Sequence, residues 1–281
     1  MKLNFIKMQG CGNDYIFFDC IKNDFLDIDF SELSKKLSNR NFSIGSDGVV
    51  LILPSLFCDA KMRMFNADGT EGNMCGNAIR CLCKYIYEEK ICQKNILKIE
   101  TNSGVKKCFL NINNNKVDSV KVDMGKPNFL TKEIPVKTNQ KYFINKNFVI
   151  DGKNFKVSCV SVGNPHCVIF KKNIDKLKLD SIGKKIENNI LFPNRINVEF
   201  VEEKKDGFYV RVWERGSGET LACGTGACAV YAVCLRLKKI KNNVDTFINL
   251  KGGKLIINCN KDRIYMAGDC NISYKGEIEI W

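Results

Sequence analysis

The sequence predicts an α+β protein of two pseudo-symmetric halves, each with many short strands and one buried helix. Two stretches, residues 62–81 and 210–228, match without a gap at a separation of 148 positions (223 − 75), pairing Arg63 with Arg211, Phe65 with Trp213, Glu71 with Glu219, Cys75 with Cys223 and Gly76 with Gly224. A shorter match lies upstream in each half, where residues 12–14 and 163–165 introduce apolar runs. A repeat of this kind indicates a duplicated fold, in which the two cysteines are expected to face one another across a cleft.

The length of 281 residues suits two domains. The pattern breaks at residues 125–128 (Gly-Lys-Pro-Asn), so we expect a first half of residues 1–124 and a second half that begins at 125. Lys7 and Gly10 interrupt the N-terminal segment before a signal-peptide core can form, and no apolar run is long enough to span a membrane. We therefore expect a cytoplasmic protein without a membrane partner.

The 15 cysteines are an odd number in a chain without a secretion signal, so we interpret most of them as reduced, buried thiols. There is no Cys-x-x-Cys pair and only one histidine, His166, so no metal site is expected. The net charge of +13 comes from scattered lysine pairs and not from one basic block. This distribution argues against a nucleic-acid partner, although it can steer an anionic substrate.

In the first half, β-rich runs predict strands at residues 5–8, 15–19, 49–53, 61–65, 97–101, 107–112 and 117–124. Residues 30–37 predict a short helix with Ser31 as its N-cap. After a loop at residues 66–73, apolar residues at 78, 82, 85 and 86 have helical spacing and predict a helix over 77–89. Cys75 is therefore expected at a helix N-terminus.

The second half repeats this arrangement, with strands predicted at residues 148–150, 155–161, 168–170, 196–201, 208–213, 255–258, 263–267 and 273–280. A helix is predicted at residues 175–187. Residues 226–237 are apolar nearly all round, which indicates a helix buried on every side. Cys223 precedes this helix as Cys75 precedes its counterpart.

A helix N-terminus stabilises a thiolate, because its free N–H groups and its dipole favour negative charge. We therefore expect a lowered pKa for both Cys75 and Cys223. The same N–H groups, from Gly76, Asn77, Gly224 and Thr225, suit a carboxylate ligand. Two acid/base groups on opposite sides of one carbon are the requirement of a racemase or epimerase, and a thiol/thiolate pair can meet it without a cofactor.

Other residues leave two interpretations open. His166, in a turn before a strand, is either a structural histidine or a site residue. Glu214 and Arg215 form either a surface ion pair or, through Arg215, a carboxylate clamp. Cys11 lies between two glycines and is either packed or exposed in a cleft, whereas Cys81, Cys83, Cys228 and Cys234 lie inside helices and pack there.

The chain resembles diaminopimelate epimerases at six motifs between residues 8 and 226. They are residues 8–15 (MQGCGNDY), 44–48 (IGSDG), 65–69 (FNADG) leading to 75–77 (CGN), 163–166 (GNPH), 194–197 (NRIN), and 213–216 (WERG) leading to 222–226 (ACGTG). The resemblance implies two similar β-barrel-like domains, each wrapped around a central helix, with residues 270–281 returning to the first domain and residues 125–269 forming the second. It also implies a homodimer.

The resemblance further implies a cofactor-independent enzyme that interconverts LL- and meso-diaminopimelate in lysine and peptidoglycan precursor synthesis. Cys75 and Cys223 would be the acid/base pair, supported by His166 and Glu214. The helix starts at Gly76, Asn77, Gly224 and Thr225 would bind the reacting carboxylate. The rest of the substrate would be held by Asn13, Asn66, Asn164, Asn197, Glu214 and Arg215.

One position departs from the family pattern: some members have a substrate-contacting glutamine where this chain has Gly48. The nearest rival function is that of a proline racemase or hydroxyproline epimerase, which resemble Met-Cys-Gly-His where this chain has Asn77. Phenazine-biosynthesis isomerases share the fold but lack the cysteine pair. An RNA-binding or thiol-redox protein would account for the charge or the cysteines, but not for their duplicated position.

Overall fold

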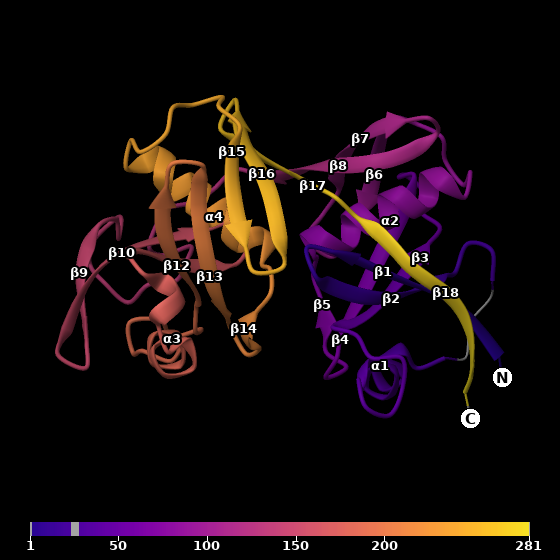
Figure 1. Cartoon of the computed structure of the whole chain (residues 1–281), viewed down its shortest axis with the longest axis horizontal. Coiled ribbons are helices and arrows are strands. Elements are labelled where there is room, and N and C mark those ends of the chain that lie inside the picture. Colours follow the sequence, from indigo (N-terminus) through magenta and orange to yellow (C-terminus); the bar gives the residue numbers. More distant parts are fainter. Residues whose placement is uncertain (1, 24–27, 281) are drawn as a thin grey trace. The chain divides into compact units, whose positions relative to one another are not determined.

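The computed structural model describes residues 2–23 and 28–280, and the chain divides into two compact units. The first unit contains the chain up to Val122 and from Ala267 onward, and the second contains Asp123–Met266. Figure 1 labels the helices and strands of both units. Within the described residues, no helix is both long enough and apolar enough to cross a membrane.

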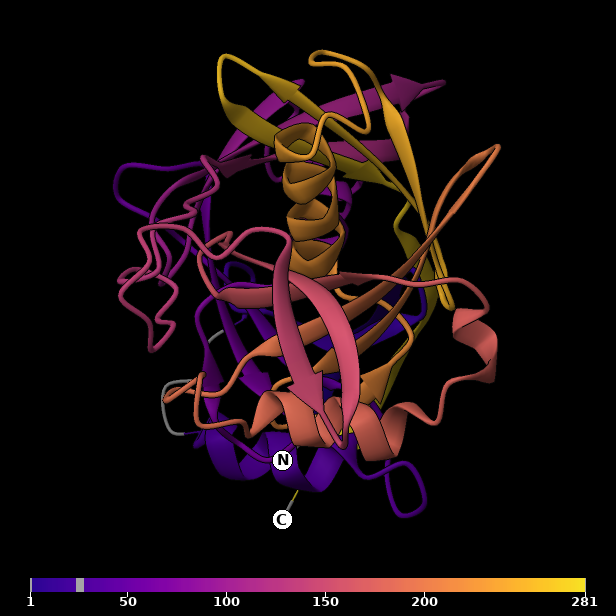
Figure 2. The same ribbon diagram turned by 90° about the vertical axis from the view of Figure 1, so that its left-hand side faces the viewer.

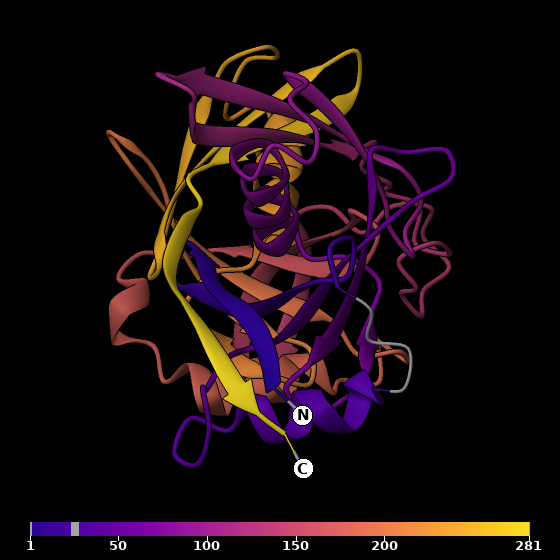
Figure 3. The ribbon, with the colours of Figure 1, turned by 90° about the vertical axis from the view of Figure 1, so that its right-hand side faces the viewer.

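The first unit is a mixed sheet with two helices. Its elements are β1 (Lys2–Gly10), β2 (Asn13–Asp19), α1 (Phe30–Ser38), β3 (Gly48–Leu53), β4 (Ala60–Asn66), β5 (Glu71–Gly72), α2 (Gly76–Glu88), β6 (Ile96–Glu100), β7 (Lys106–Asn113), β8 (Lys116–Gly125, which crosses the unit boundary) and β18 (Asn271–Glu279). The last strand, β18, runs antiparallel beside β1, as Figure 3 shows.

The second unit contains the same kinds of element. They are β9 (Lys146–Ile150), β10 (Lys153–Ser161), β11 (Pro165–Phe170), the 3-10 turn η1 (Ile174–Lys176), α3 (Leu179–Glu187), β12 (Asn197–Lys204), β13 (Gly207–Glu214), β14 (Gly218–Thr220), α4 (Gly224–Arg236), β15 (Thr246–Leu250), β16 (Gly253–Asn260) and β17 (Arg263–Gly268, which also crosses the unit boundary).

The strand pairings of the two units correspond one by one, which confirms the duplicated fold. The pairs β2/β3 and β11/β12 are both parallel, as are β4/β6 and β13/β15. The pairs β1/β2 and β10/β11, and β3/β4 and β12/β13, are antiparallel. The register agrees as well, because Val49 pairs with Phe65 in the first unit and Val198 pairs with Trp213 in the second.

One buried helix lies among the strands of each unit. Helix α2 packs on β1, β2 and β7, and α4 packs on β10, β11, β12, β15 and β16. Figure 2 shows α4 with strands of its own unit around it. The apolar sequence of α4 is buried on every side along most of its length, as predicted. Both central helices therefore have fixed N-termini, and these are the ends that carry the two cysteines.

Several local predictions were wrong. Asp29, and not Ser31, caps α1, because the Asp29 side chain accepts hydrogen bonds from the backbone N–H groups of Ser31 and Glu32. The helix predicted at residues 175–187 begins only at Leu179. The Arg211 guanidinium bonds the carbonyl oxygens of Ile174 and Leu177 at 2.7 and 2.9 Å, and the extended backbone of Leu177 separates η1 from α3.

Three short strands were not predicted. β5 lies inside the expected loop at residues 66–73, and β14 and β15 have no counterpart among the predicted strands. β5 and β14 contain only two and three residues, too few for an alternating pattern to be recognised. They pair with β4 and β13 at equivalent places and lead the chain toward the two cysteines.

Candidate active site

Cys75 is the N-cap residue of α2. Its extended backbone (φ −123°, ψ 124°) ends the preceding loop, and its Sγ accepts a hydrogen bond from Ala78 N at 3.5 Å. Cys75 is partly exposed, and its Sγ lies 3.3 Å from Asn13 Oδ1. Because the first N–H groups of a helix have no partner within the helix, this thiol lies where negative charge is favoured.

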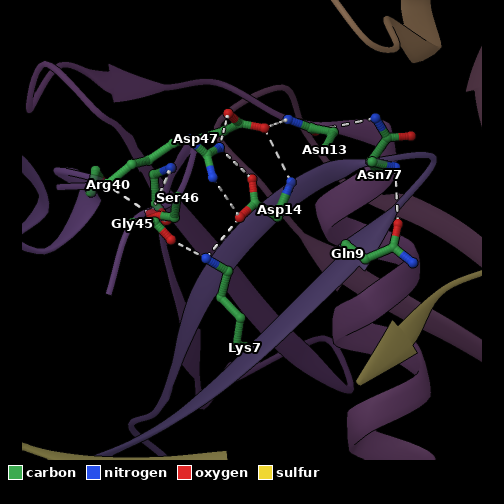
Figure 4. Close-up of polar contacts among 12 residues, drawn as sticks. Lys7, Gln9, Asn13, Asp14, Arg40, Gly45, Ser46, Asp47 and Asn77 are labelled. Atoms are coloured by element: carbon green, nitrogen blue, oxygen red, sulfur yellow. Dashed lines mark hydrogen bonds and ion pairs between the residues drawn. The ribbon is translucent and has the colours of Figure 1, made fainter. Parts of the chain in front are cut away.

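The amide of Asn13 connects Cys75 to a charged cluster, whose members Asp14, Arg40 and Asp47 are drawn with Asn13 in Figure 4. Asn13 Oδ1 accepts from Asn77 Nδ2 at 3.1 Å, and Asn13 Nδ2 donates to Asp47 Oδ2 at 2.6 Å. Asp47 in turn pairs with Arg40 at 2.9 Å, and Arg40 also binds Asp14. The cluster fixes the direction in which the Asn13 amide points, so the oxygen faces the cysteine.

Two other predicted residues of the first unit have different surroundings. Asn77 is almost fully buried, and its Oδ1 atom is a buried acceptor with no hydrogen-bond partner among the described residues. Asn66 donates to Thr70 Oγ1 at 2.9 Å within the turn that follows β4. The hydrogen-bond network of Figure 4 therefore includes Asn13 and Asn77, and Asn66 belongs to a separate turn.

Cys223 is the N-cap residue of α4 and has nearly the same backbone conformation (φ −120°, ψ 109°). Its Sγ accepts a hydrogen bond from Gly226 N at 3.3 Å and lies 3.4 Å from Thr225 Oγ1. The prediction that each cysteine precedes its helix is confirmed for both units. Unlike Cys75, Cys223 is buried, with 6% of its surface exposed.

The predicted lowering of the Cys223 pKa was wrong. Burial raises the pKa of the Cys223 thiol well above its ordinary value, and the carboxylates of Glu214 and Glu199 raise it further. The hydrogen bonds from Thr225 and Gly226 act in the opposite direction but are outweighed. The helix N-terminus alone therefore does not decide the charge of this thiol, because desolvation disfavours the thiolate.

Glu214 and Arg215 do not pair with each other among the described residues. Glu214 accepts a hydrogen bond from Thr220 Oγ1 at 2.6 Å, and Arg215 Nη1 donates to Asn194 O at 3.0 Å. Burial raises the pKa of Glu214, while Thr220 and the charge of His166 oppose this shift. Asn197 Oδ1 accepts from Arg215 N at 2.9 Å and so holds the start of the loop.

His166 lies at the start of β11 and is completely buried. Its Nε2 atom lies 2.9 Å from Asn164 Oδ1, and its Nδ1 atom lies 2.6 Å from Glu199 Oε1. Glu199 was not among the predicted site residues. A signal for it exists in the sequence, because it is the one carboxylate within the apolar strand predicted at residues 196–201.

Tyr15 is a second residue that the sequence analysis missed. Its side chain is buried and hydrogen-bonds the Cys75 side chain, and burial followed by the Cys75 charge raises the Tyr15 pKa well above its usual value. A Cβ atom at Gly48 would lie 2.1 Å from Phe65 O and 3.1 Å from the Tyr15 ring. No glutamine side chain fits at position 48 in this backbone, and the Tyr15 ring lies beside the glycine instead.

Cys11 packs within the first unit. It is 2% exposed, and Arg80 Nη2 donates to its Sγ at 3.8 Å. The interpretation of Cys11 as a buried residue is therefore confirmed, and the alternative of an exposed position is wrong.

Comparison with known proteins agrees with these motifs. A sequence model described as "Diaminopimelate epimerase" matches residues 5–130 and 158–273. A diaminopimelate epimerase from Acetivibrio thermocellus is 47% identical over 281 residues, which cover 99% of this chain and 99% of the relative.

Solved structures that share the fold have much lower identity. A probable proline racemase from Agrobacterium radiobacter superposes with a TM-score of 0.75 at 13% identity, covering 99% of this chain and 93% of that one. A phenazine biosynthesis protein of the PhzF family from Bacillus anthracis gives 0.73 at 16% identity, covering 100% of both chains. These two likenesses establish the fold, while the sequence matches distinguish among its members: the chain belongs to the diaminopimelate epimerase family.

Proposed function

We propose that this protein interconverts LL- and meso-diaminopimelate by a two-base reaction of Cys75 and Cys223 that needs no cofactor. The reaction would serve lysine and peptidoglycan precursor synthesis in the cytoplasm. Family membership over nearly the whole chain supports the substrate. The observation that carries the mechanism is the duplicated N-cap cysteine, whose Sγ in each unit accepts the N–H of the residue three positions later.

In the proposed reaction, one cysteine is a thiolate and the other is a thiol. The thiolate removes the α-proton, so a new S–H bond forms as the C–H bond breaks and leaves its electron pair on the α-carbon. The thiol then donates its proton to the opposite face of that carbon. The two thiols have exchanged protonation states at the end of a turnover, so the reverse reaction starts from the state in which the forward reaction ends.

The substrate carboxylate must take up the charge that develops on the α-carbon. The free N–H groups at the starts of α2 and α4, from Gly76, Asn77, Gly224 and Thr225, are suited to this task. Glycine at the first helical position of both helices leaves room for the ligand to approach the backbone.

Polar groups in each unit support binding of the remaining substrate atoms. In the first unit these are the side-chain amides of Asn13, Asn66 and Asn77, which can donate and accept hydrogen bonds. In the second unit they are Asn164, Asn197, Glu214 and Arg215. The exposed Arg215 guanidinium carries a positive charge suited to the distal carboxylate, and Glu214 carries a negative charge suited to an ammonium group. We also propose a homodimer, on the resemblance alone.

A chiral assay tests the function directly. The purified protein is incubated with a chelator and without pyridoxal phosphate, separately with LL-diaminopimelate and with L-proline. We expect conversion of LL- to meso-diaminopimelate and no D-proline. Racemisation of proline with untouched diaminopimelate would instead assign the chain to the proline racemase reaction.

Solvent isotope incorporation tests the mechanism. In deuterium oxide, the product α-carbon should gain deuterium during turnover, because the proton that is returned comes from a thiol in exchange with solvent. Epimerisation with complete retention of the original hydrogen would contradict the two-base reaction.

A further inference from the structure

Glu199 is a buried carboxylate that the proposed reaction does not use. It lies on β12 with its side chain fully buried, and its Oε1 atom is 2.6 Å from His166 Nδ1. Its Oε2 atom is buried and has no hydrogen-bond partner among the described residues. Because a buried charge is costly unless a counter-charge accompanies it, this carboxylate can stay ionised only with a cation beside it.

His166 is the residue in ion-pair contact with Glu199. On the opposite side of the ring, Nε2 lies 2.9 Å from Asn164 Oδ1. Both ring nitrogens thus face oxygen atoms, and an imidazole donates from both nitrogens only when it carries two protons. This geometry fits an imidazolium held between a carboxylate and an amide oxygen.

Two further titratable groups of the same unit face this pair. The positive charge of His166 favours the ionised form of Glu214, which burial disfavours. Glu214 in turn hydrogen-bonds the Cys223 side chain, and the charges of Glu214 and Glu199 both act on Cys223. The proton on His166 therefore influences the carboxylate that is in contact with the reacting thiol.

Gly226 allows the Glu199 carboxylate to approach the first turn of α4. A Cβ atom at this position would lie 2.9 Å from Glu199 Oε1 and 3.3 Å from Cys223 Sγ. The carboxylate and the thiol thus lie around one point that only a glycine leaves empty. The Gly226 N–H is the same group that donates to Cys223.

The first unit differs at all three equivalent positions. The strand register aligns Val50 with Glu199, because Val50 pairs with Met64 and Glu199 with Val212, 148 positions further on (212 − 64). Ala78 occupies the position of Gly226, since both lie three residues after the cysteine. Tyr15 stands at the position of His166, two residues after the asparagine of the motif. The carboxylate, the histidine and the glycine occur together in one unit and are absent together from the other.

We propose that Glu199 is a positioning residue that holds the second proton on His166, so that a positive charge faces Glu214 while Cys223 gains and loses its proton. Its role in turnover rests on the proposed epimerase function. The charge state of His166 does not, and this separates the two ideas experimentally.

Nuclear magnetic resonance of the substrate-free protein reads that charge without ambiguity, because His166 is the only histidine in the chain. In ¹⁵N-labelled wild type we expect the ring signals of an imidazolium at pH 7, with both nitrogens protonated. Glu199→Gln keeps a hydrogen-bond acceptor but removes the charge, and should give a neutral ring. Glu199→Asp keeps the charge and should retain the imidazolium. A neutral ring in the wild type overturns the proposal whether or not a variant folds. Identical ring signals in wild type and a folded Glu199→Gln variant overturn it as well.

The pH profile of kcat/KM supplies the second measurement. Glu199→Gln removes two opposing charges near Glu214: loss of the His166 cation raises the Glu214 pKa, whereas loss of the Glu199 anion lowers it. Because His166 has the larger effect of the two, the acidic limb of the profile should move up in Glu199→Gln, by less than about one pH unit. The loss of kcat/KM should therefore be largest on the acidic limb, at most about tenfold, and should become smaller as the pH rises. A merely structural role would lower activity equally at all pH values, and that outcome counts against the proposal.

Glu203→Gln is the matched control, because Glu203 lies on the same strand with a half-exposed side chain that bonds Lys239. It should leave both the histidine signals and the pH profile unchanged. If wild-type protein does not epimerise diaminopimelate at all, the proposed function fails, while the histidine signals still decide the role of Glu199.

Discussion

At the N-terminus of α2, Cys75 Sγ lies 3.3 Å from an amide oxygen, and a neighbouring tyrosine hydroxyl hydrogen-bonds it. At the N-terminus of α4, Cys223 shares its surroundings with two glutamates and, through them, a histidine. The backbone angles of the two cysteines differ by no more than 15° (124 − 109 for ψ). Duplication has thus preserved the helix start and changed what surrounds the thiol.

The difference separates two ways of controlling a thiol. Next to the Cys75 sulfur lies the neutral amide of Asn13, which also bonds Asn77. The charged side chains of this network begin one residue further away, at Asp47, which bonds the Asn13 amide. Around Cys223, ionisable side chains lie beside the sulfur, so its protonation depends on theirs. A substrate with two different ends and a defined hand cannot be read by two identical halves, and these surroundings supply the asymmetry.

Removing either thiol gives the largest expected effect. Cys75→Ala and Cys223→Ala should each lower kcat/KM for LL-diaminopimelate at least ~10³-fold, because each deletes one of two obligatory acid/base groups. Cys81→Ala in α2 and Cys228→Ala in α4 are the matched controls, since both thiols are buried in the same helices and should retain most activity. Full turnover by Cys75→Ala or Cys223→Ala in the chiral assay would contradict the two-base mechanism.

The equivalent ion pairs of the two units should differ in their contribution to stability. Arg63 bonds Glu71 at 2.8 Å with its side chain 40% exposed, whereas Arg211 bonds Glu219 at 2.8 Å with 9% exposed and also bonds the carbonyls of η1. Arg211→Ala should therefore lower the free energy of unfolding by about 3 kcal/mol, and Arg63→Ala by less than about 1 kcal/mol. Urea titration monitored by circular dichroism measures both.

Acid titration gives a second measure of the Arg211 pair. The hydrogen bond from Arg211 lowers the pKa of Glu219 below its ordinary value. The contribution of the Arg211–Glu219 pair to the free energy of unfolding is then fully present above the unfolded-state pKa of Glu219, about 4.3. It is lost as the pH falls through the lower pKa that Glu219 has in the folded state. Equal losses in the two arginine variants, or a stability of Arg211→Ala with the same acid dependence as wild type, would contradict this assignment.

Exchanging the residues that lie three positions after each cysteine, Gly226 in α4 and Ala78 in α2, tests whether activity requires a glycine at position 226. Gly226→Ala should lower kcat/KM about tenfold to a hundredfold, because its Cβ would displace the Glu199 carboxylate and the Cys223 sulfur, and displacements near 1 Å have effects of this size. The matched change in the first unit, Ala78→Gly, removes an atom and should change activity less than about threefold. Comparable losses of kcat/KM in both variants would mean that activity depends on the residue type at this helix position in either unit, and not on the space that Gly226 leaves for the Glu199 carboxylate.

The sequence predicted the parts of the site that are local. The gapless repeat, with helical spacing after Cys75 and a nearly all-apolar segment after Cys223, was enough to predict both helices close to their cysteines, because these patterns depend on neighbouring residues. The parallel pairing of β11 with β12 brings His166 and Glu199 together across 33 positions, and no local pattern encodes that pairing.

Burial explains the other failures. The expected lowering of the Cys223 pKa came from the helix N-terminus alone, and the opposing desolvation depends on the side chains that tertiary packing brings around the sulfur. Similarly, the helix predicted from residue 175 begins later because Arg211, which is distant in sequence, bonds the carbonyls that would otherwise continue it.

Alkylation rates in the substrate-free protein should show the smallest difference between the two cysteines. Iodoacetamide reacts with the thiolate, and Cys223 is buried with a raised pKa, whereas Cys75 is partly exposed. At pH 7.5, Cys75 should therefore react about tenfold faster than Cys223, as measured by peptide mass spectrometry of quenched samples. A thiol with a raised pKa stays protonated until the pH approaches that pKa, so the alkylation rate of Cys223 should still be rising with pH above 9. Glu214→Gln should increase the Cys223 rate at fixed pH, because it removes one of the two carboxylates that raise the Cys223 pKa. Faster modification of Cys223 than of Cys75 at neutral pH would reverse the comparison and assign the resting thiolate to the second unit.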